Sequence, residues 1–326
     1  MKGKYRIIVQ NKRIKYDFEI KRNITIIRGD SATGKTALVD MIREYYENGE
    51  DSGIELSCEK NCAVLEGRNW EANLALLENT IIFIDEGNFF VSSKEFAKAV
   101  RDSSNYYVIV TRESLATLPY AVDEIYGIRN SGKYGNLKQT YNEVYRIYNL
   151  EAVLTNIKPE LVITEDSNSG YQFFEEVCRK NSLECLTAEG KSNIFAMAER
   201  TQAQSVLIIA DGAAFGPEME KIIKLMKVKP QLNLYLPESF EWLVLQSELF
   251  VDLEIKEILA TPYDYINSEE YLSWERYFTQ LLIDKTKDSY LSYSKKVLNP
   301  VYKQEMVAGK ILKVMEKIAL SWNNYN

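Results

Sequence analysis

Short apolar runs alternate with amphipathic stretches along most of this chain of 326 residues. Near the start, residues 5–10 and 13–20 alternate apolar and polar positions, which predicts two strands joined by a hairpin turn. Helical periodicity follows, and we expect an α/β domain over residues 1–150. Three short runs rich in apolar and β-branched residues within it predict buried strands: residues 23–28, 80–84 and 106–110.

The same alternation restarts in the second half of the chain. Apolar runs that read as strands alternate with stretches of helical periodicity, which predicts a parallel sheet in a second α/β domain over residues 158–250. The predicted strands are residues 160–164, 183–186, 205–210 and 232–236. The fold class we expect is therefore α/β throughout, with two sheet domains and a helical C-terminal region over residues 251–326.

The C-terminal region carries an aromatic stripe at helical spacing between Tyr271 and Leu282, and a second amphipathic helix is predicted over 305–320. The stripe has two interpretations, core packing or a surface for a partner or nucleic acid. Eight lysines make the region locally basic: Lys285, Lys287, Lys295, Lys296, Lys303, Lys310, Lys313 and Lys317. The plainer interpretation of these lysines is a solvated face.

A glycine loop stands between the apolar run 23–28 and a predicted helix, and it fits the phosphate-loop pattern G-x-x-x-x-G-K-[ST]. Backbone N–H groups and the positive end of the following helix would surround an anion there. Lys35 would reach the β- and γ-phosphates of ATP, and the Thr36 hydroxyl would bind Mg²⁺. The alternative is a glycine turn that binds nothing. The candidate nucleotide-binding residues are Gly29, Asp30, Ser31, Ala32, Thr33, Gly34, Lys35 and Thr36.

Two carboxylates, Asp85 and Glu86, follow the apolar run 80–84. This arrangement resembles the Walker B motif of P-loop ATPases. The resemblance implies that Asp85 holds Mg²⁺ and that Glu86 orients or deprotonates the attacking water. The alternative is a strand that ends in a polar turn.

Arg112 follows the next apolar run, and strand ends in such sheets open onto a ligand crevice. Arg112, or Thr111 beside it, is therefore a candidate for sensing the γ-phosphate. A salt bridge from Arg112 to Glu113 or Glu86 is the competing interpretation. A finer prediction concerns the helix before this strand, where Ser92 is expected to be the N-cap.

Strands of the second half also end in acids, at Glu165, Asp211 and Glu238. In a parallel sheet these ends share one edge, and carboxylates gathered there usually hold a divalent cation. The layout resembles the TOPRIM domain, and an ATPase followed by a TOPRIM domain resembles the OLD-family nucleases, which are linked to phage defence. That resemblance implies cleavage of DNA with Mg²⁺ or Mn²⁺, with Glu165 as general acid or base.

The second aspartate of the TOPRIM Asp-x-Asp pattern is Ala213 in this chain. Either another acid supplies the missing ligand, or the metal site is lost. The candidates are Glu238, Glu241, Asp166 and Glu218. A plain Rossmann-like domain with acids as strand-end caps, or a small-molecule site, are the other interpretations.

The amino-acid composition excludes several kinds of catalytic and metal-binding site. The chain has no histidine, which excludes Ser-His-Asp and Cys-His catalysis and histidine-ligated metals. Its net charge of −7 creates no global attraction for nucleic acid, and Cys58 and Cys62 lack the partners of a zinc site. No run of 18 apolar residues and no signal peptide is present, so we expect a cytoplasmic protein without membrane association.

The function expected from these features is Mg²⁺-dependent ATP hydrolysis coupled to a TOPRIM-like nuclease, with DNA rather than RNA as substrate. The alternative is an ATPase switch or adaptor without nuclease activity, which acts on a protein partner or a second copy of the chain. A small-molecule kinase is the third possibility.

Overall fold

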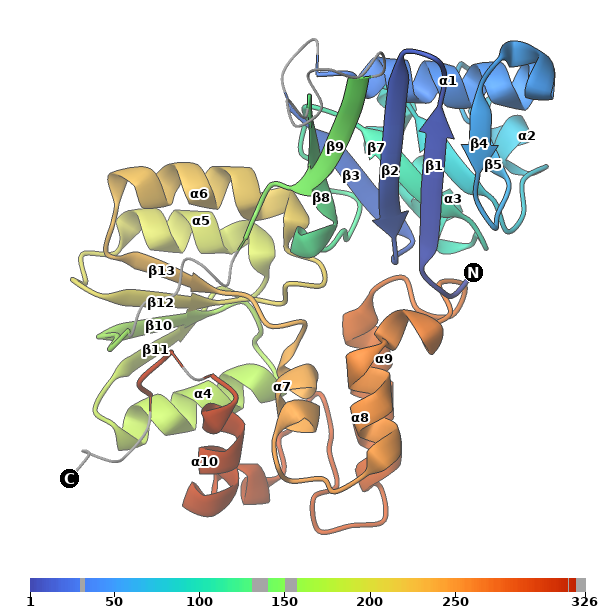
Figure 1. The fold of residues 1–326 in the computed structure, drawn as a ribbon. Helices are drawn as coiled ribbons and strands as arrows, with labels where there is room; N and C mark the ends of the chain where they lie inside the picture. Colours follow the sequence, from blue (N-terminus) through green and yellow to red (C-terminus); the bar gives the residue numbers. More distant parts are fainter. Residues whose placement is uncertain (30–32, 131–139, 150–156, 316, 321–326) are drawn as a thin grey trace. The chain divides into compact units, whose positions relative to one another are not determined.

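The computed structural model describes residues 1–29, 33–130, 140–149, 157–315 and 317–320. The chain divides into two compact units, which are described separately (Figure 1). The first is Met1–Tyr148 with Thr261–Leu272, and the second is Asn149–Ala260 with Ser273–Asn326. A large curled sheet and a second, parallel sheet carry the fold, so the expected mixed α/β class is confirmed at that level.

The sheet of the first unit has the strand order β4-β1-β2-β9-β8-β3-β7-β6-β5. Strands β1 and β2 form the predicted antiparallel hairpin, whereas β3, β7, β6 and β5 run parallel to one another. The carboxyl ends of β3, β7 and β6 therefore lie at one edge. The strands are β1 Tyr5–Gln10, β2 Ile14–Ile20, β3 Ile24–Arg28, β4 Glu55–Ser57, β5 Cys62–Val64, β6 Ile81–Ile84, β7 Tyr106–Val110, β8 Ile125–Asn130 and β9 Thr140–Arg146.

The helices of this unit include α1 Lys35–Asn48, α2 Trp70–Leu74 and α3 Lys94–Arg101. The predicted N-cap of α3 was wrong by one residue. Ser93, not Ser92, accepts the hydrogen bond from the Phe96 N–H, at 3.0 Å, and the Ser92 hydroxyl donates instead to the Phe89 carbonyl. Two serines in succession offer the same chemistry, and only the path of the chain selects between them.

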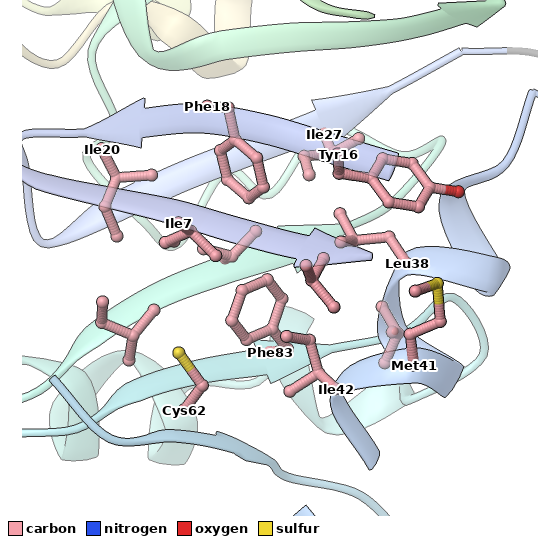
Figure 2. Packing of buried hydrophobic residues seen from close by; sticks show 14 of the residues in the cluster. Ile7, Tyr16, Phe18, Ile20, Ile27, Leu38, Met41, Ile42, Cys62 and Phe83 are labelled. Atoms are coloured by element: carbon pink, nitrogen blue, oxygen red, sulfur yellow. The ribbon is translucent and has the colours of Figure 1, made fainter. Parts of the chain in front are cut away.

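Apolar packing on the sheet fixes the position of α1. All residues of β3, β6 and β7 are buried, and α1 inserts Leu38, Val39 and Ile42 into the same core. Figure 2 shows Ile42 beside Phe83 of β6. Full burial of each such side chain stabilises the fold by roughly 1.5–3 kcal/mol. The first residue of α1 is thereby held close after the end of β3.

The second unit has a four-stranded parallel sheet in the order β11-β10-β12-β13, which confirms the predicted parallel pairing. Helix α4 covers one face of this sheet, and α5 and α6 cover the other (Figure 1). The strands are β10 Leu161–Thr164, β11 Glu184–Thr187, β12 Val206–Ile209 and β13 Leu232–Tyr235. The helices include α4 Ser169–Lys180, α5 Lys191–Arg200, α6 Met219–Val228, α7 Phe240–Gln246, α8 Leu253–Ala260, α9 Trp274–Thr286 and α10 Glu305–Lys313.

In the C-terminal region the aromatic stripe is mainly core. Trp274, Phe278 and Leu282 of α9 are buried. Helix α10 ends at Lys313, seven residues before the predicted end. Lys285, Lys295 and Lys313 form salt bridges with acids of the same unit, so the stretch is not a uniformly positive surface. Among the described residues, no helix has both the length and the apolar character needed to cross a membrane.

Candidate functional site

The loop between β3 and α1 begins and ends on glycines with left-handed backbone angles. Gly29 has φ 138° and Gly34 has φ 95°, values that side-chain-bearing residues rarely adopt. A Cβ atom at Gly34 would also lie 2.8 Å from the Tyr16 hydroxyl oxygen and 2.9 Å from Asn142 Nδ2. Position 34 therefore requires glycine on two grounds. Three predicted site residues, Asp30, Ser31 and Ala32, lie outside the described residues.

Lys35 turns its ammonium group into this loop. The Lys35 Nζ donates hydrogen bonds to the Gly29 carbonyl, at 2.8 Å, and to Thr33 Oγ1, at 3.2 Å. The residue is buried, although it is the first of α1. The N-cap, Gly34, has no side chain with which to accept the first N–H groups of the helix. A positive side chain and the positive end of a helix dipole thus share one small region, as an anion site requires.

The structure brings Thr36 and Asp85 together, although 49 positions separate them in the sequence. Their side chains form a hydrogen bond, and Asp85 Oδ1 also accepts the Glu86 N–H at 2.8 Å. Burial raises the pKa of Asp85, and the neighbouring Asp40 adds to the rise while Arg43 opposes it. A hydroxyl oxygen and a carboxylate side by side are hard ligands that suit Mg²⁺.

Arg112 and Glu86 complete the site from the two neighbouring strands. Because β7 lies between β3 and β6, the Arg112 Nε reaches Glu86 Oε1 at 2.7 Å. Of the two competing interpretations of Arg112, the salt bridge to Glu86 is present, and the γ-phosphate role stays a prediction. The Thr111 hydroxyl forms a hydrogen bond within its own turn, in which it accepts the Glu113 N–H at 3.0 Å.

These residues surround a cavity of about 440 Å³. Its lining combines the phosphate loop, the start of α1 and the ends of β6 and β7: Thr33, Gly34, Lys35, Thr36, Ala37, Glu86 and Arg112. The volume falls within the range of small-molecule sites in proteins. The lining therefore contains donors for an anion together with the carboxylate of Glu86.

Sequence reasoning missed Arg28, the buried last residue of β3. Its Nη2 donates to the Tyr120 hydroxyl at 2.8 Å and to the Glu113 carbonyl at 3.1 Å. These bonds connect the entry of the glycine loop to the segment that follows β7. A charged residue that closes an otherwise apolar run, directly before Gly29, was the available signal.

In the second unit, Glu165 and Asp211 follow the adjacent strands β10 and β12, as predicted. The Asp211 N–H donates to Glu165 Oε2 at 3.0 Å. Burial raises the pKa of Asp211 well above its usual value, and the charges that act on it come from Glu275, Lys295, Glu165 and Glu241. Burial also raises the pKa of Glu165, to about 7.

Four acids, Glu165, Asp211, Glu241 and Glu275, form what we call the acid group of the second unit. Lys295 supplies a positive charge within it. Its Nζ lies 3.0 Å from Glu241 Oε1 and 3.3 Å from Glu275 Oε1. Glu241 is fully buried and also accepts the Tyr293 hydroxyl at 2.5 Å. The sequence did not predict Lys295 or Glu275 at this site. Both residues lie far beyond the last strand of the sheet in the sequence, in helix α9 and the loop after it, and neither follows a predicted strand.

Among the acids considered as substitutes for the missing aspartate, Glu241 is one that acts on Asp211. The Asp166 carboxylate accepts the N–H groups of Asn168 and Gly170, both at 2.9 Å, and so caps the start of α4. The backbone of Glu238 contacts the loop after β12, where the Glu238 carbonyl accepts the Ala213 N–H at 3.3 Å. Its metal role stays a prediction. Within the described ranges, no three or more acids or cysteines are placed to hold a metal ion together.

Comparison of the chain with models of known protein families gives no match, and neither does a search among curated proteins.

Proposed function

We propose that this chain binds ATP with Mg²⁺ in the first unit and hydrolyses it. The observation that carries the proposal is the convergence of Lys35, Thr36, Asp85 and Glu86 at one edge of the sheet. The first two residues begin α1, and the other two follow β6. A glycine loop alone would support anion binding only, whereas the added carboxylates support a reaction on the bound phosphates.

Each residue has a separate role in this proposal. The Lys35 ammonium and the N–H groups that begin α1 bind the β- and γ-phosphates. Thr36 and Asp85 hold Mg²⁺, which neutralises charge on the phosphate oxygens when it is bound. Glu86 orients a water molecule towards the γ-phosphorus and accepts its proton as the bond to ADP breaks. Arg112 is placed to approach the γ-phosphate from the neighbouring strand end.

Isothermal titration of the full chain with Mg·ATP tests the proposal. We expect saturable binding, and we expect Lys35→Ala to weaken it by roughly 10- to 150-fold, because one charge-assisted hydrogen-bond donor to phosphate is lost. Lys94→Ala is the matched control, since Lys94 also opens a helix, α3, but does not line the cavity.

Absence of heat with the wild-type protein contradicts the ATP assignment, as does equal weakening by the two lysine substitutions. Phosphate release measured in parallel separates hydrolysis from transfer. Phosphate that appears on an added small acceptor, rather than in solution, supports the kinase alternative instead.

The acid group of the second unit supports a second candidate activity, metal-dependent cleavage of nucleic acid in the manner of a TOPRIM domain. The supporting observation is the contact between Glu165 and Asp211 at adjacent strand ends. Ala213 and the Lys295 ammonium favour the other alternative, an ATPase switch without nuclease activity, because they reduce the negative charge that attracts a cation.

Incubation of the full chain with DNA and with RNA, in Mg²⁺ or Mn²⁺, distinguishes these alternatives. We expect cleavage of DNA, and a decrease of about 10- to 100-fold or more in Asp211→Asn, as for the loss of groups that support a metal site. Asp288→Asn, an exposed acid of the same unit, is the control. Intact DNA under all conditions leaves the ATPase switch as the function of the chain. Cleavage that survives Asp211→Asn would show that Glu165 and Asp211 do not form the site of cleavage.

A further inference from the structure

Tyr16 of strand β2 holds the carbonyl group of the last glycine in the loop. Its hydroxyl donates to the Gly34 carbonyl at 2.7 Å, and this oxygen also accepts the Leu38 N–H at 3.0 Å. The Tyr16 side chain is fully buried, and Figure 2 shows its ring next to Leu38 within the core of the first unit. The core of the first unit thus contacts the end of the glycine loop through the Tyr16 hydroxyl.

Asn142 of strand β9 supports Tyr16 from the side. The two residues are direct partners in the parallel pairing of β2 with β9, and their side chains share a hydrogen bond. Because the Tyr16 proton is directed to Gly34, the Asn142 amide must be the donor in that bond. Asn142 is itself buried, so both side chains have little freedom to move. Burial raises the pKa of Tyr16, and its hydroxyl therefore stays neutral and able to donate.

Peptide geometry converts this contact into an effect on the loop. The Gly34 carbonyl and the Lys35 N–H belong to one planar trans peptide, and they point in opposite directions. The carbonyl points along α1 towards Leu38 and Tyr16. The Lys35 N–H must then point out of the start of the helix, on the side of the cavity lined by Gly34, Lys35 and Thr36.

We propose that Tyr16 and Asn142 are positioning residues for the phosphates of the nucleotide, because they fix the peptide whose N–H faces them. The inference depends on the proposed ATP-binding function of the first unit. It also explains why position 34 must be glycine in this chain, in addition to the requirement of the phosphate-loop pattern. Both supporting atoms lie so close to position 34 that no side chain fits between them and the backbone.

The Tyr16→Phe variant tests the proposal, since it removes only the hydroxyl and keeps the ring in the core. We expect the dissociation constant of Mg·ATP, measured by titration calorimetry, to rise about three- to tenfold, which corresponds to the loss of one hydrogen bond. The turnover number at saturating ATP should change less than this affinity, because Tyr16 touches neither Glu86 nor the attacking water in the proposed reaction.

Tyr107→Phe is the matched control. Tyr107 is also fully buried, its hydroxyl donates to Ser103 Oγ at 2.9 Å, and it pairs with Ile24 at the far end of β3 from the glycine loop. Both substitutions should lower the midpoint of thermal unfolding by similar amounts, but only Tyr16→Phe should weaken nucleotide binding. Asn142→Ala serves as a second variant, which we expect to weaken binding two- to threefold alone and to add little in the Tyr16→Phe background.

An affinity of Tyr16→Phe equal to that of the wild type, or an equal loss in Tyr107→Phe, overturns the inference while leaving the ATPase proposal in place. Should Tyr16→Phe not fold, unchanged binding by Asn142→Ala overturns it. A wild-type protein that binds no ATP removes the proposed function, and this inference with it.

Discussion

Replacing Glu86 by glutamine is expected to slow ATP hydrolysis by about 10²- to 10⁴-fold while Mg·ATP still binds. An amide of the same shape keeps the packing at the end of β6 but cannot accept a proton from water. Glu86 lines the cavity, and Lys35 and Thr36, which are proposed to bind the phosphates, are unchanged in this variant. The effect should therefore appear in the turnover number rather than in the affinity. Phosphate release at saturating Mg·ATP, with calorimetry in parallel, measures the two quantities separately.

Glu113→Gln is the control for this substitution. Glu113 is exposed and follows Arg112 directly, but it does not line the cavity. Hydrolysis at the wild-type rate in Glu86→Gln would show that Glu86 is not the base. An equal decrease in both variants would point to a general effect of charge near Arg112.

The second large effect concerns the buried Glu124, which precedes β8. This residue is fully buried; its Oε2 accepts the Thr25 hydroxyl at 3.1 Å, and its Oε1 has no hydrogen-bond partner among the described residues. Burial, with a smaller contribution from Asp123, raises the pKa of Glu124 to about 8, whereas Arg22 acts in the opposite direction. The folded protein therefore keeps a proton that the unfolded chain has released.

Glu124 should consequently contribute a fall of roughly 3–5 kcal/mol in the free energy of unfolding as the pH rises from about 4.5 to about 8, and no further change above that pH. Glu124→Gln cannot titrate and should remove this part of the pH dependence. Asp123 does not contribute in this window, because its pKa in the folded state lies below the usual value and it is ionised in both states. Urea unfolding at pH 5, 7 and 9 measures the difference between variant and wild type.

Glu95→Gln, which alters an exposed acid of α3, should leave the pH dependence unchanged. If Glu124→Gln shows the same slope as the wild type, Glu124 is ionised in the folded protein and the assignment of its proton is wrong.

Local patterns predicted the elements of this fold better than their arrangement. The runs that became β3, β6 and β7 are mostly apolar, and the glycine loop has a pattern that reads directly from the sequence. The position of β9 beside β2 depends on pairing between segments more than 120 residues apart, for which single-sequence periodicity carries no signal. Tyr16 and Asn142 were missed for that reason.

In the acid group of the second unit, too, local patterns predicted some residues, whereas those brought in by long-range packing were missed. Glu165 and Asp211 follow predicted strands, so parallel pairing alone was enough to expect them at one edge. Glu275 and Lys295 reach the group from helix α9 and the loop beyond it. Their approach is fixed by packing such as that of Trp274 and Phe278, which sequence spacing identifies as buried without saying against what.

The chain leaves the first unit after Tyr148 and returns to it at Thr261–Leu272. The returning segment is bonded to the start of the chain, where the Ser268 N–H donates to the Met1 carbonyl at 2.8 Å and the Gly3 N–H donates to the Tyr263 carbonyl at 2.7 Å. During synthesis these bonds cannot form until the ribosome has translated most of the second unit. A fragment that stops at residue 148 would leave those backbone groups without their partners. The first unit should therefore complete its folding only after residues 261–272 have left the ribosome.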